Sequence, residues 1–155
     1  MAEDLENTLI LTLDTGPVTI RLRPDLAPGH VARIKELARE GFYDGVVFHR
    51  VIEGFMAQGG DPTGTGMGGS QKPNLPAEFS KAPHNRGVCS MARSSSPNSA
   101  NSQFFICFDN ANFLDGQYTV WGEVVEGMDN VDALPKGEPP RNPGKIVSAK
   151  VAADA

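Results

Sequence analysis

Two segments of the chain place polar side chains among large apolar ones, and these residues are the best candidates for chemistry. They are FHRVIEGFMAQGGD, residues 48–61, and NSQFFICF, residues 101–108. In a strand with a period of two, Phe48 and Arg50 share one face and Val51 takes the other. Arg50 then either points into solvent or lies at the rim of a cavity, and this pattern alone favours the solvated arginine. The same pattern alone predicts a core position for the large apolar residues, which are Phe55, Met56, Phe104, Phe105 and Leu114.

Two other motifs suggest chemistry that their surroundings do not support. Gly64, Gly66 and Gly69 have the G-x-G-x-x-G spacing of dinucleotide-binding loops, but no apolar strand precedes them and SQKPNLP cannot open a helix. The serines at 94–96 have no histidine or acid at a recognisable distance, and the chain has no G-x-S-x-G elbow. The glycines therefore indicate a flexible loop, and neither a nucleotide site nor a hydrolase is favoured.

The cysteines and histidines predict no metal site. Cys89 and Cys107 stand in the apolar stretches VCSM and FFICF, where a small buried thiol is the favoured interpretation. His30, His49 and His84 lack the spacing of a zinc site. No metal or other cofactor is expected.

The bulk composition predicts one soluble domain over residues 1–155, with a flexible N-terminal segment over residues 1–7. A length of 155 residues is enough to bury a stable core, and 17 Gly with 12 Pro favour strands joined by turns. The net charge of -5 argues against nucleic-acid binding. The acidic N-terminus has no basic and apolar leader, and no apolar run approaches the length of a membrane helix. We therefore expect a cytoplasmic protein that binds no membrane.

The pattern of apolar residues predicts a mainly β fold with two helices. Residues 26–41 have helical spacing, with Pro28 in the first turn and Gly41 at the end, and a short helix is expected over Met128–Leu134 before Pro135. A long surface loop is expected over Gly59–Arg86. Closure into a barrel would remove exposed strand edges. The predicted strands are Thr8–Leu13, Val18–Leu22, Val47–Ile52, Phe55–Gln58, Val88–Ala92, Phe104–Phe108, Thr119–Val125 and Ile146–Val151.

The order and spacing of several motifs resemble the cyclophilin signature. The motifs are FHRVIEGFMAQGGD, CSMA, NSQFFICF, and FLDG followed by VWGEVVEGM, and the similarity runs from about Leu9 to the end. The resemblance implies a closed eight-stranded antiparallel β-barrel capped by two α-helices. It also implies a groove on the outer face and peptidyl-prolyl cis-trans isomerase activity that needs no cofactor.

The resemblance also implies roles for individual residues. Arg50 matches the catalytic arginine, and Gln58 matches the glutamine of the substrate groove. Ala92 and Gln103 match residues of the neighbouring groove, flanked by Gly68 or Gly69. The residues that match the wall and floor of the proline pocket are Phe55, Met56, Phe105 and Leu114.

Three positions depart from the common pattern of the family. Arg93 replaces an asparagine whose contact is made by the backbone, so peptide binding is expected to survive. Phe113 replaces a tryptophan, which removes an indole N–H and implies reduced affinity for cyclosporin A. Tyr118 replaces a histidine but can still close one side of the pocket.

The implied function is an isomerase that acts as a monomer on proline-containing peptides and on unfolded or folding proteins, as a folding chaperone does. Two alternatives remain open. A binding module could keep the groove without catalysis, since a fold does not guarantee activity. A hydrolase or nucleotide enzyme would require motifs whose context is missing here.

Overall fold

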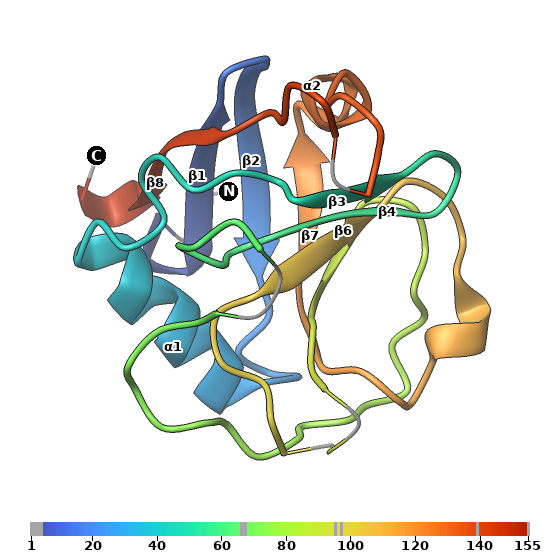
Figure 1. Cartoon of the computed structure of the whole chain (residues 1–155). Helices are drawn as coiled ribbons and strands as arrows, with labels where there is room; N and C mark the ends of the chain where they lie inside the picture. Colours follow the sequence, from blue (N-terminus) through green and yellow to red (C-terminus); the bar gives the residue numbers. More distant parts are fainter. Residues whose placement is uncertain (1–4, 66–67, 95, 97, 139, 155) are drawn as a thin grey trace.

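The computed structural model describes residues 5–65, 68–94, 96, 98–138 and 140–154. Its fold is mainly β, with a single eight-stranded sheet in which every pair of neighbouring strands is antiparallel. The strand order is β3-β4-β6-β5-β7-β2-β1-β8. The sheet curls into an open barrel, with α1 and α2 towards opposite ends (Figure 1). The strands are β1 (Thr8–Leu13), β2 (Gly16–Leu22), β3 (Arg50–Ile52), β4 (Met56–Gly59), β5 (Val88–Met91), β6 (Phe104–Cys107), β7 (Val120–Glu126) and β8 (Ile146–Val151). The helices are α1 (Pro28–Arg39) and α2 (Met128–Asp132), with short 3-10 helices η1 (Leu5–Asn7), η2 (Asn112–Leu114) and η3 (Ala152–Asp154).

The two edge strands, β3 and β8, form no ladder with each other among the described residues. The chain just before β3 crosses the gap instead: Phe48 N donates to Gly144 O at 2.8 Å, and Ile146 N donates to Val46 O at 2.8 Å. The prediction of a closed barrel is therefore confirmed only as far as a curled, open sheet of eight antiparallel strands with two helices.

The hairpin of β1 and β2 confirms the period of two that the sequence predicts. Alternate residues along both strands are buried, and Leu11 and Val18 are register partners. These side chains join the main core. The predicted strand Val47–Ile52 is shorter in the structure, because regular pairing with β4 begins only at Arg50.

Helix α1 begins at Pro28 and packs one face into the core, as the sequence predicts. Val31, Ile34 and Leu37 are buried, and Gly41 has a φ of 72°, a backbone conformation that glycine adopts without strain. Helix α2 ends at Asp132, two residues earlier than predicted. The residue before a proline disfavours the helical conformation, so the chain leaves the helix ahead of Pro135.

The long loop between β4 and β5 contains no strand among its described residues, but it is well anchored. Asp61 is fully buried, and its carboxylate accepts hydrogen bonds from the backbone N–H groups of Thr63, Thr65 and Gly68 at 2.8, 3.2 and 3.0 Å. Later in the loop, Glu78 accepts hydrogen bonds from the first turn of α1. Buried or partly buried carboxylates therefore fix a segment that has few apolar residues of its own.

The start of the chain is tied to α1 where the structure describes it. Leu5–Asn7 form η1, and the Glu6 carboxylate pairs with Lys35 and Arg39, each at 2.9 Å. Residues 1–4, which belong to the segment predicted to be flexible, lie outside the described residues. No helix in the described part of the chain is long and apolar enough to cross a membrane.

Candidate active site

Arg50 begins strand β3 and points away from the main core. It pairs with Gln58 across the β3–β4 ladder, and its side chain is 45% exposed, whereas the next residue, Val51, is buried. Phe48, expected on the same face as Arg50, is fully buried against Phe104 instead. That expectation is wrong because Phe48 precedes the strand, where the period of two does not yet apply.

Arg50 lies at a cavity of about 150 Å³ whose remaining walls are mostly apolar. The apolar wall is a small hydrophobic cluster, separate from the main core, in which Met56 and Phe105 are buried. This cluster forms because β4 and β6 send alternate side chains to opposite faces: Ala57 and Ile106 enter the main core, and Met56 and Phe105 face the cavity. The cavity is lined by Arg50, Phe55, Met56, Gln58, Ala92, Arg93, Phe105, Leu114 and Tyr118.

A larger cavity of about 500 Å³, lined mostly by polar residues and glycines, adjoins the first and is called the polar cavity. The two share Gln58, Ala92 and Arg93, so together they form one continuous groove. The second cavity also includes Gln103 and, from the long loop, Gly68, Gly69 and Ser70. An extended peptide could place one residue in the apolar cavity and its neighbours in the polar one.

A chain of amides fixes the boundary between the two cavities. Gln58 Nε2 donates to Gln103 Oε1 at 3.0 Å, and Gln103 Nε2 donates to Gly68 O at 2.8 Å. Because its amide nitrogen is engaged, Gln58 can offer Oε1 as an acceptor beside Arg50. The predicted groove glutamines are therefore held in place before any substrate arrives.

Glu138 is a neighbour of Arg50 that the sequence motifs do not indicate. Its Oε1 accepts a hydrogen bond from Arg50 Nε at 3.1 Å. Two backbone hydrogen bonds of 2.8 Å between Val51 and Gly137 bring this acid to the strand. The contact joins positions 88 residues apart in the chain, so only the fold reveals it.

Arg93 supports the wall of the cavity. Its Nε and Nη2 donate to Gln117 O at 3.1 and 2.8 Å, and its guanidinium lies 4.7 Å from the centre of the Tyr118 ring. A cation over an aromatic face is attracted to it. Arg93 therefore holds Tyr118 at the mouth of the apolar cavity.

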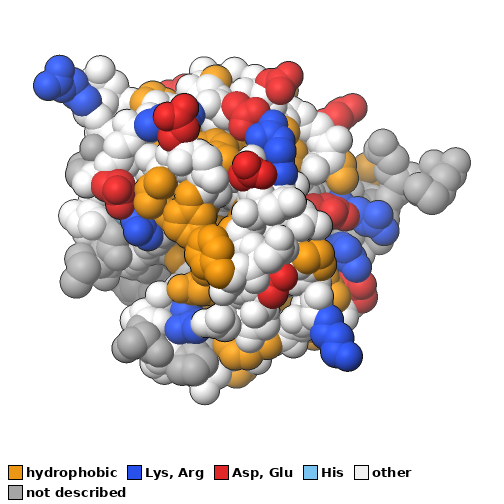
Figure 2. All heavy atoms as spheres, turned by 90° about the vertical axis from the view of Figure 1, so that its right-hand side faces the viewer, with side chains coloured by type: hydrophobic (Ala, Val, Ile, Leu, Met, Phe, Trp, Pro, Cys, Tyr) orange, Lys and Arg blue, Asp and Glu red, His pale blue; other side chains and the backbone are white. Residues whose placement is uncertain are grey.

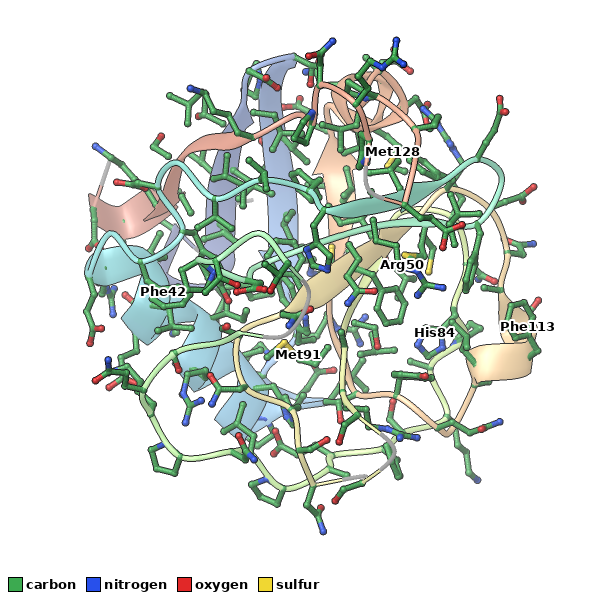
Figure 3. All side chains as sticks on the ribbon, viewed as in Figure 1. Phe42, Arg50, His84, Met91, Phe113 and Met128 are labelled. Carbon is green, nitrogen blue, oxygen red and sulfur yellow. The ribbon has the colours of Figure 1, made fainter. Side chains whose placement is uncertain are left out.

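Phe113 does not line either of these cavities, unlike the other predicted site residues. It is 68% exposed on η2 and touches the outer side of Phe55, with ring centres 5.6 Å apart. Phe113 lies at the outer edge of the molecule, on the same side as Arg50 (Figure 3). The side of the molecule that carries η2 shows a band of hydrophobic side chains among scattered charged ones (Figure 2).

The cysteines and serines of the site region are not arranged for covalent catalysis. Burial raises the pKa of Cys107 to about 12 and that of Cys89 well above its usual value, so both remain protonated thiols. Ser94 Oγ pairs with Ser99 Oγ at 2.8 Å, and Ser95 lies outside the described residues. Within the described residues, no group of three or more His, Cys, Asp or Glu is placed to hold a metal ion.

Comparison with known proteins agrees with this geometry. The family model described as cyclophilin type peptidyl-prolyl cis-trans isomerase/CLD matches residues 8–151. A protein of Brucella suis named probable peptidyl-prolyl cis-trans isomerase is 57% identical over 169 residues, covering 99% of this chain and 86% of its own. A peptidyl-prolyl cis-trans isomerase of Synechococcus elongatus is 40% identical and covers 94% of this chain and 97% of its own.

Solved structures share the same fold. The crystal structure of cyclophilin AquaCyp293 from Hirschia baltica aligns with a TM-score of 0.92 at 33% identity, over 100% of this chain and 77% of that one. A Cryptosporidium parvum cyclophilin, crystallised in the presence of the dipeptide Ala-Pro, aligns with a TM-score of 0.87 at 29% identity, over 93% and 98% of the two chains. The chain belongs to the cyclophilin-type peptidyl-prolyl cis-trans isomerases.

Proposed function

We propose that Arg50 is the catalytic residue and that the apolar cavity beside it receives the proline ring of the substrate. The observation that carries this assignment is a half-exposed guanidinium at the rim of an apolar cavity of about 150 Å³. Drug-sized ligands usually occupy roughly 300 to 1,000 Å³. The smaller cavity beside Arg50 suits a single side chain of a peptide.

The reaction requires rotation about a stiff bond. Delocalisation of the nitrogen lone pair gives the peptide bond a rotational barrier of about 18 to 20 kcal/mol, and X-Pro bonds exchange in tens to hundreds of seconds. A turnover of about 10 to 1,000 per second requires a barrier lower by roughly 4 to 7 kcal/mol. No covalent step is needed to achieve this.

Arg50 can stabilise the twisted state more than either planar one. As the bond twists, the proline nitrogen becomes pyramidal and regains its lone pair, which can accept a hydrogen bond from the guanidinium. A hydrogen bond to a charged group contributes about 1.5 to 3 kcal/mol. The remainder must come from fixing the ring in the cavity while Gln58 and backbone groups hold the flanking carbonyls.

The polar cavity would receive the residues on one side of the proline. It is lined by amides, serines and glycines, which suit backbone recognition of varied sequences. The Ala-Pro dipeptide used with the Cryptosporidium parvum cyclophilin supports proline-containing peptides as substrates. We infer that the substrates are proline-containing peptides and unfolded or folding proteins, whose folding the enzyme assists as a chaperone.

Cyclosporin A is proposed to bind with reduced affinity. Phe113 carries no indole N–H that could donate to the drug. It lies outside the residues that line the two cavities, so its identity should affect the drug more than turnover.

The enzyme is proposed to act as a monomer in the cytoplasm and to bind neither nucleic acids nor membranes. The net charge of -5 supports the second part of this proposal, because nucleic acids and anionic membrane surfaces attract basic proteins. We also propose that the curled sheet behaves as a closed barrel, because hydrogen bonds at Val46, Phe48 and Ile146 already span its gap.

A coupled isomerisation assay on a short X-Pro peptide tests the catalytic assignment. Arg50→Ala should remove most of the acceleration while leaving the protein folded, because the side chain is half exposed and outside the main core. Near-normal turnover by the folded variant would overturn the role of Arg50. No acceleration by the natural protein would favour the binding module without catalysis.

A further inference from the structure

His84 is a fully buried histidine that lies directly behind the proposed proline pocket. Its ring stacks on Phe105, with centres 6.1 Å apart and planes 19° apart, and meets Tyr118 edge-on at 6.5 Å. Both of these rings line the apolar cavity. His84 lies on the same side of the molecule as Arg50 and Phe113 (Figure 3). It therefore supports two of the pocket's rings from the side opposite the substrate.

His84 also holds the segment 111–119, which carries one wall of the pocket. Its backbone carbonyl accepts a hydrogen bond from Ala111 N at 2.7 Å. Its backbone N–H donates to Asp115 Oδ1 at 2.7 Å, and its Nδ1 lies 3.0 Å from the same oxygen. Two points of the wall segment are thus fixed to one residue.

A third attachment runs through Ser90 on β5. His84 Nε2 lies 3.0 Å from Ser90 Oγ, and Ser90 Oγ lies 2.8 Å from Thr119 O. The attachments at 111, 115 and 119 therefore bracket Leu114 and Tyr118, the two pocket residues of this segment.

The protons of this network can be placed from its donors and acceptors. Hydrogen bonds from His84 keep the pKa of Asp115 below its usual value, so the carboxylate can only accept and His84 Nδ1 must donate. Burial lowers the pKa of His84 despite this partner, which favours the neutral ring. Nε2 of the neutral ring can then only accept, and the single hydroxyl proton of Ser90 goes either to Nε2 or to Thr119 O, which also accepts from Met91 N at 3.0 Å. A neutral histidine therefore keeps the attachments at 111 and 115, and the third contact shares one proton between His84 and Thr119.

We propose that His84 is a positioning residue for proline binding, holding the wall segment 111–119 so that Leu114 and Tyr118 enclose the proline ring. This inference rests on the proposed assignment of the apolar cavity as the proline pocket. A wall that is held in advance does not have to be ordered when the substrate binds, so its loss should weaken binding. Arg50 donates to Glu138 and makes no described hydrogen bond with this network, so the chemical step should be affected less.

The kinetics of three variants test the role. His84→Leu removes the ring and both side-chain hydrogen bonds, and should raise KM about tenfold with kcat changed less than about twofold. His84→Asn can restore the donor to Asp115, and should recover part of the loss. Ser90→Ala removes only the third attachment and should raise KM by about threefold, which keeps the proposal testable if the His84 variants do not fold.

His30 on α1 provides a matched control. It is also fully buried, its Nδ1 lies 2.7 Å from Glu78 Oε1, and its backbone N–H donates to the same oxygen at 2.8 Å. It does not line either cavity of the groove. His30→Leu and His30→Asn should destabilise the fold by amounts similar to those of the His84 variants but leave KM unchanged.

The outcomes separate the two proposals. Equal KM values for the folded His84 and His30 variants, with Arg50→Ala inactive, would overturn only the positioning role. Full activity of Arg50→Ala, with KM still raised in the His84 variants, would overturn only the catalytic role of Arg50. The NMR methyl signals of Leu114 provide a second measurement, because they report on the position and mobility of the wall segment. These signals should broaden or shift in the His84 variants, and no change would contradict the proposal.

Discussion

The guanidinium of Arg50 is oriented by the Glu138 carboxylate, which reaches it from a distant part of the chain. Arg50 Nε donates to Glu138 Oε1, and within the described part of the chain neither terminal nitrogen makes a hydrogen bond, so both can reach a substrate. Both side chains are about half exposed, at 45% and 57%. Exposed pairs of this kind contribute about 0 to 1 kcal/mol and are weakened by salt. The Glu138 carboxylate therefore helps to orient the Arg50 side chain, but Arg50 keeps its positive charge without it.

Glu138→Gln should lower kcat/KM by about two- to fivefold at low ionic strength, because the guanidinium loses its charged partner and its preferred direction. The peptide assay at low and high salt measures this, and the two proteins should converge as salt rises. Glu53→Gln removes an exposed acid from the β3–β4 turn and serves as the control for the change in net charge. Identical activity of Glu138→Gln and the natural protein at low salt would contradict the orienting role.

Among the elements, the edges of the sheet determine how rigidly Arg50 is held. Strand β3 is an edge strand, and among the described residues its outer side pairs with Gly137 through Val51, while the residues just before β3 pair with Gly144 and Ile146. An edge strand with unpaired backbone groups would exchange its amide hydrogens quickly and move more. These bridging bonds are therefore the local basis for a stable position of Arg50.

Hydrogen exchange measures whether the gap is closed in solution. The amides of Phe48 and Ile146 should be protected nearly as well as those of the β1–β2 ladder, because both donate across the gap at 2.8 Å. NMR-detected exchange resolves the individual amides. Exchange of both at the rate of exposed loop amides would show that the barrel opens there.

For the molecule as a whole, three buried histidines make stability depend on pH. Burial lowers the pKa of His30, His49 and His84 in the folded state. An unfolded histidine has a pKa of about 6.5, so below that pH the unfolded chain binds more protons and stability falls. The carboxylates of Glu78 and Asp115, whose pKa values are lowered, act in the same direction at lower pH, since their stabilisation is lost as they become protonated.

The free energy of unfolding should therefore decrease between about pH 7.5 and pH 5.5, before most carboxylates titrate. Urea denaturation at a series of pH values measures this decrease. Titration of the histidine ring signals by NMR provides the control, since all three should titrate below their unfolded value. A constant free energy of unfolding across this range would contradict neutral, buried histidines.

The sequence by itself determined the family, the strands and helices, and all the residues that line the apolar cavity, but only part of the polar cavity. Periodic apolar residues are local signals: alternation located β1 and β2, and helical spacing located α1, because burial follows the period of each element. The signature motifs identified the cavity residues from Arg50 to Tyr118, of which only Phe113 lies outside the cavity walls.

The tertiary structure decided whether Arg50 faces open solvent or a cavity, because that depends on what packs beside the strand. It also revealed the long-range partners: Glu138 beside Arg50, Glu78 at the start of α1, and His84 behind the pocket. Such contacts join residues tens of positions apart and leave no periodic trace in the sequence. They depend on side chains that meet only after the sheet has curled, and only the folded arrangement brings them together.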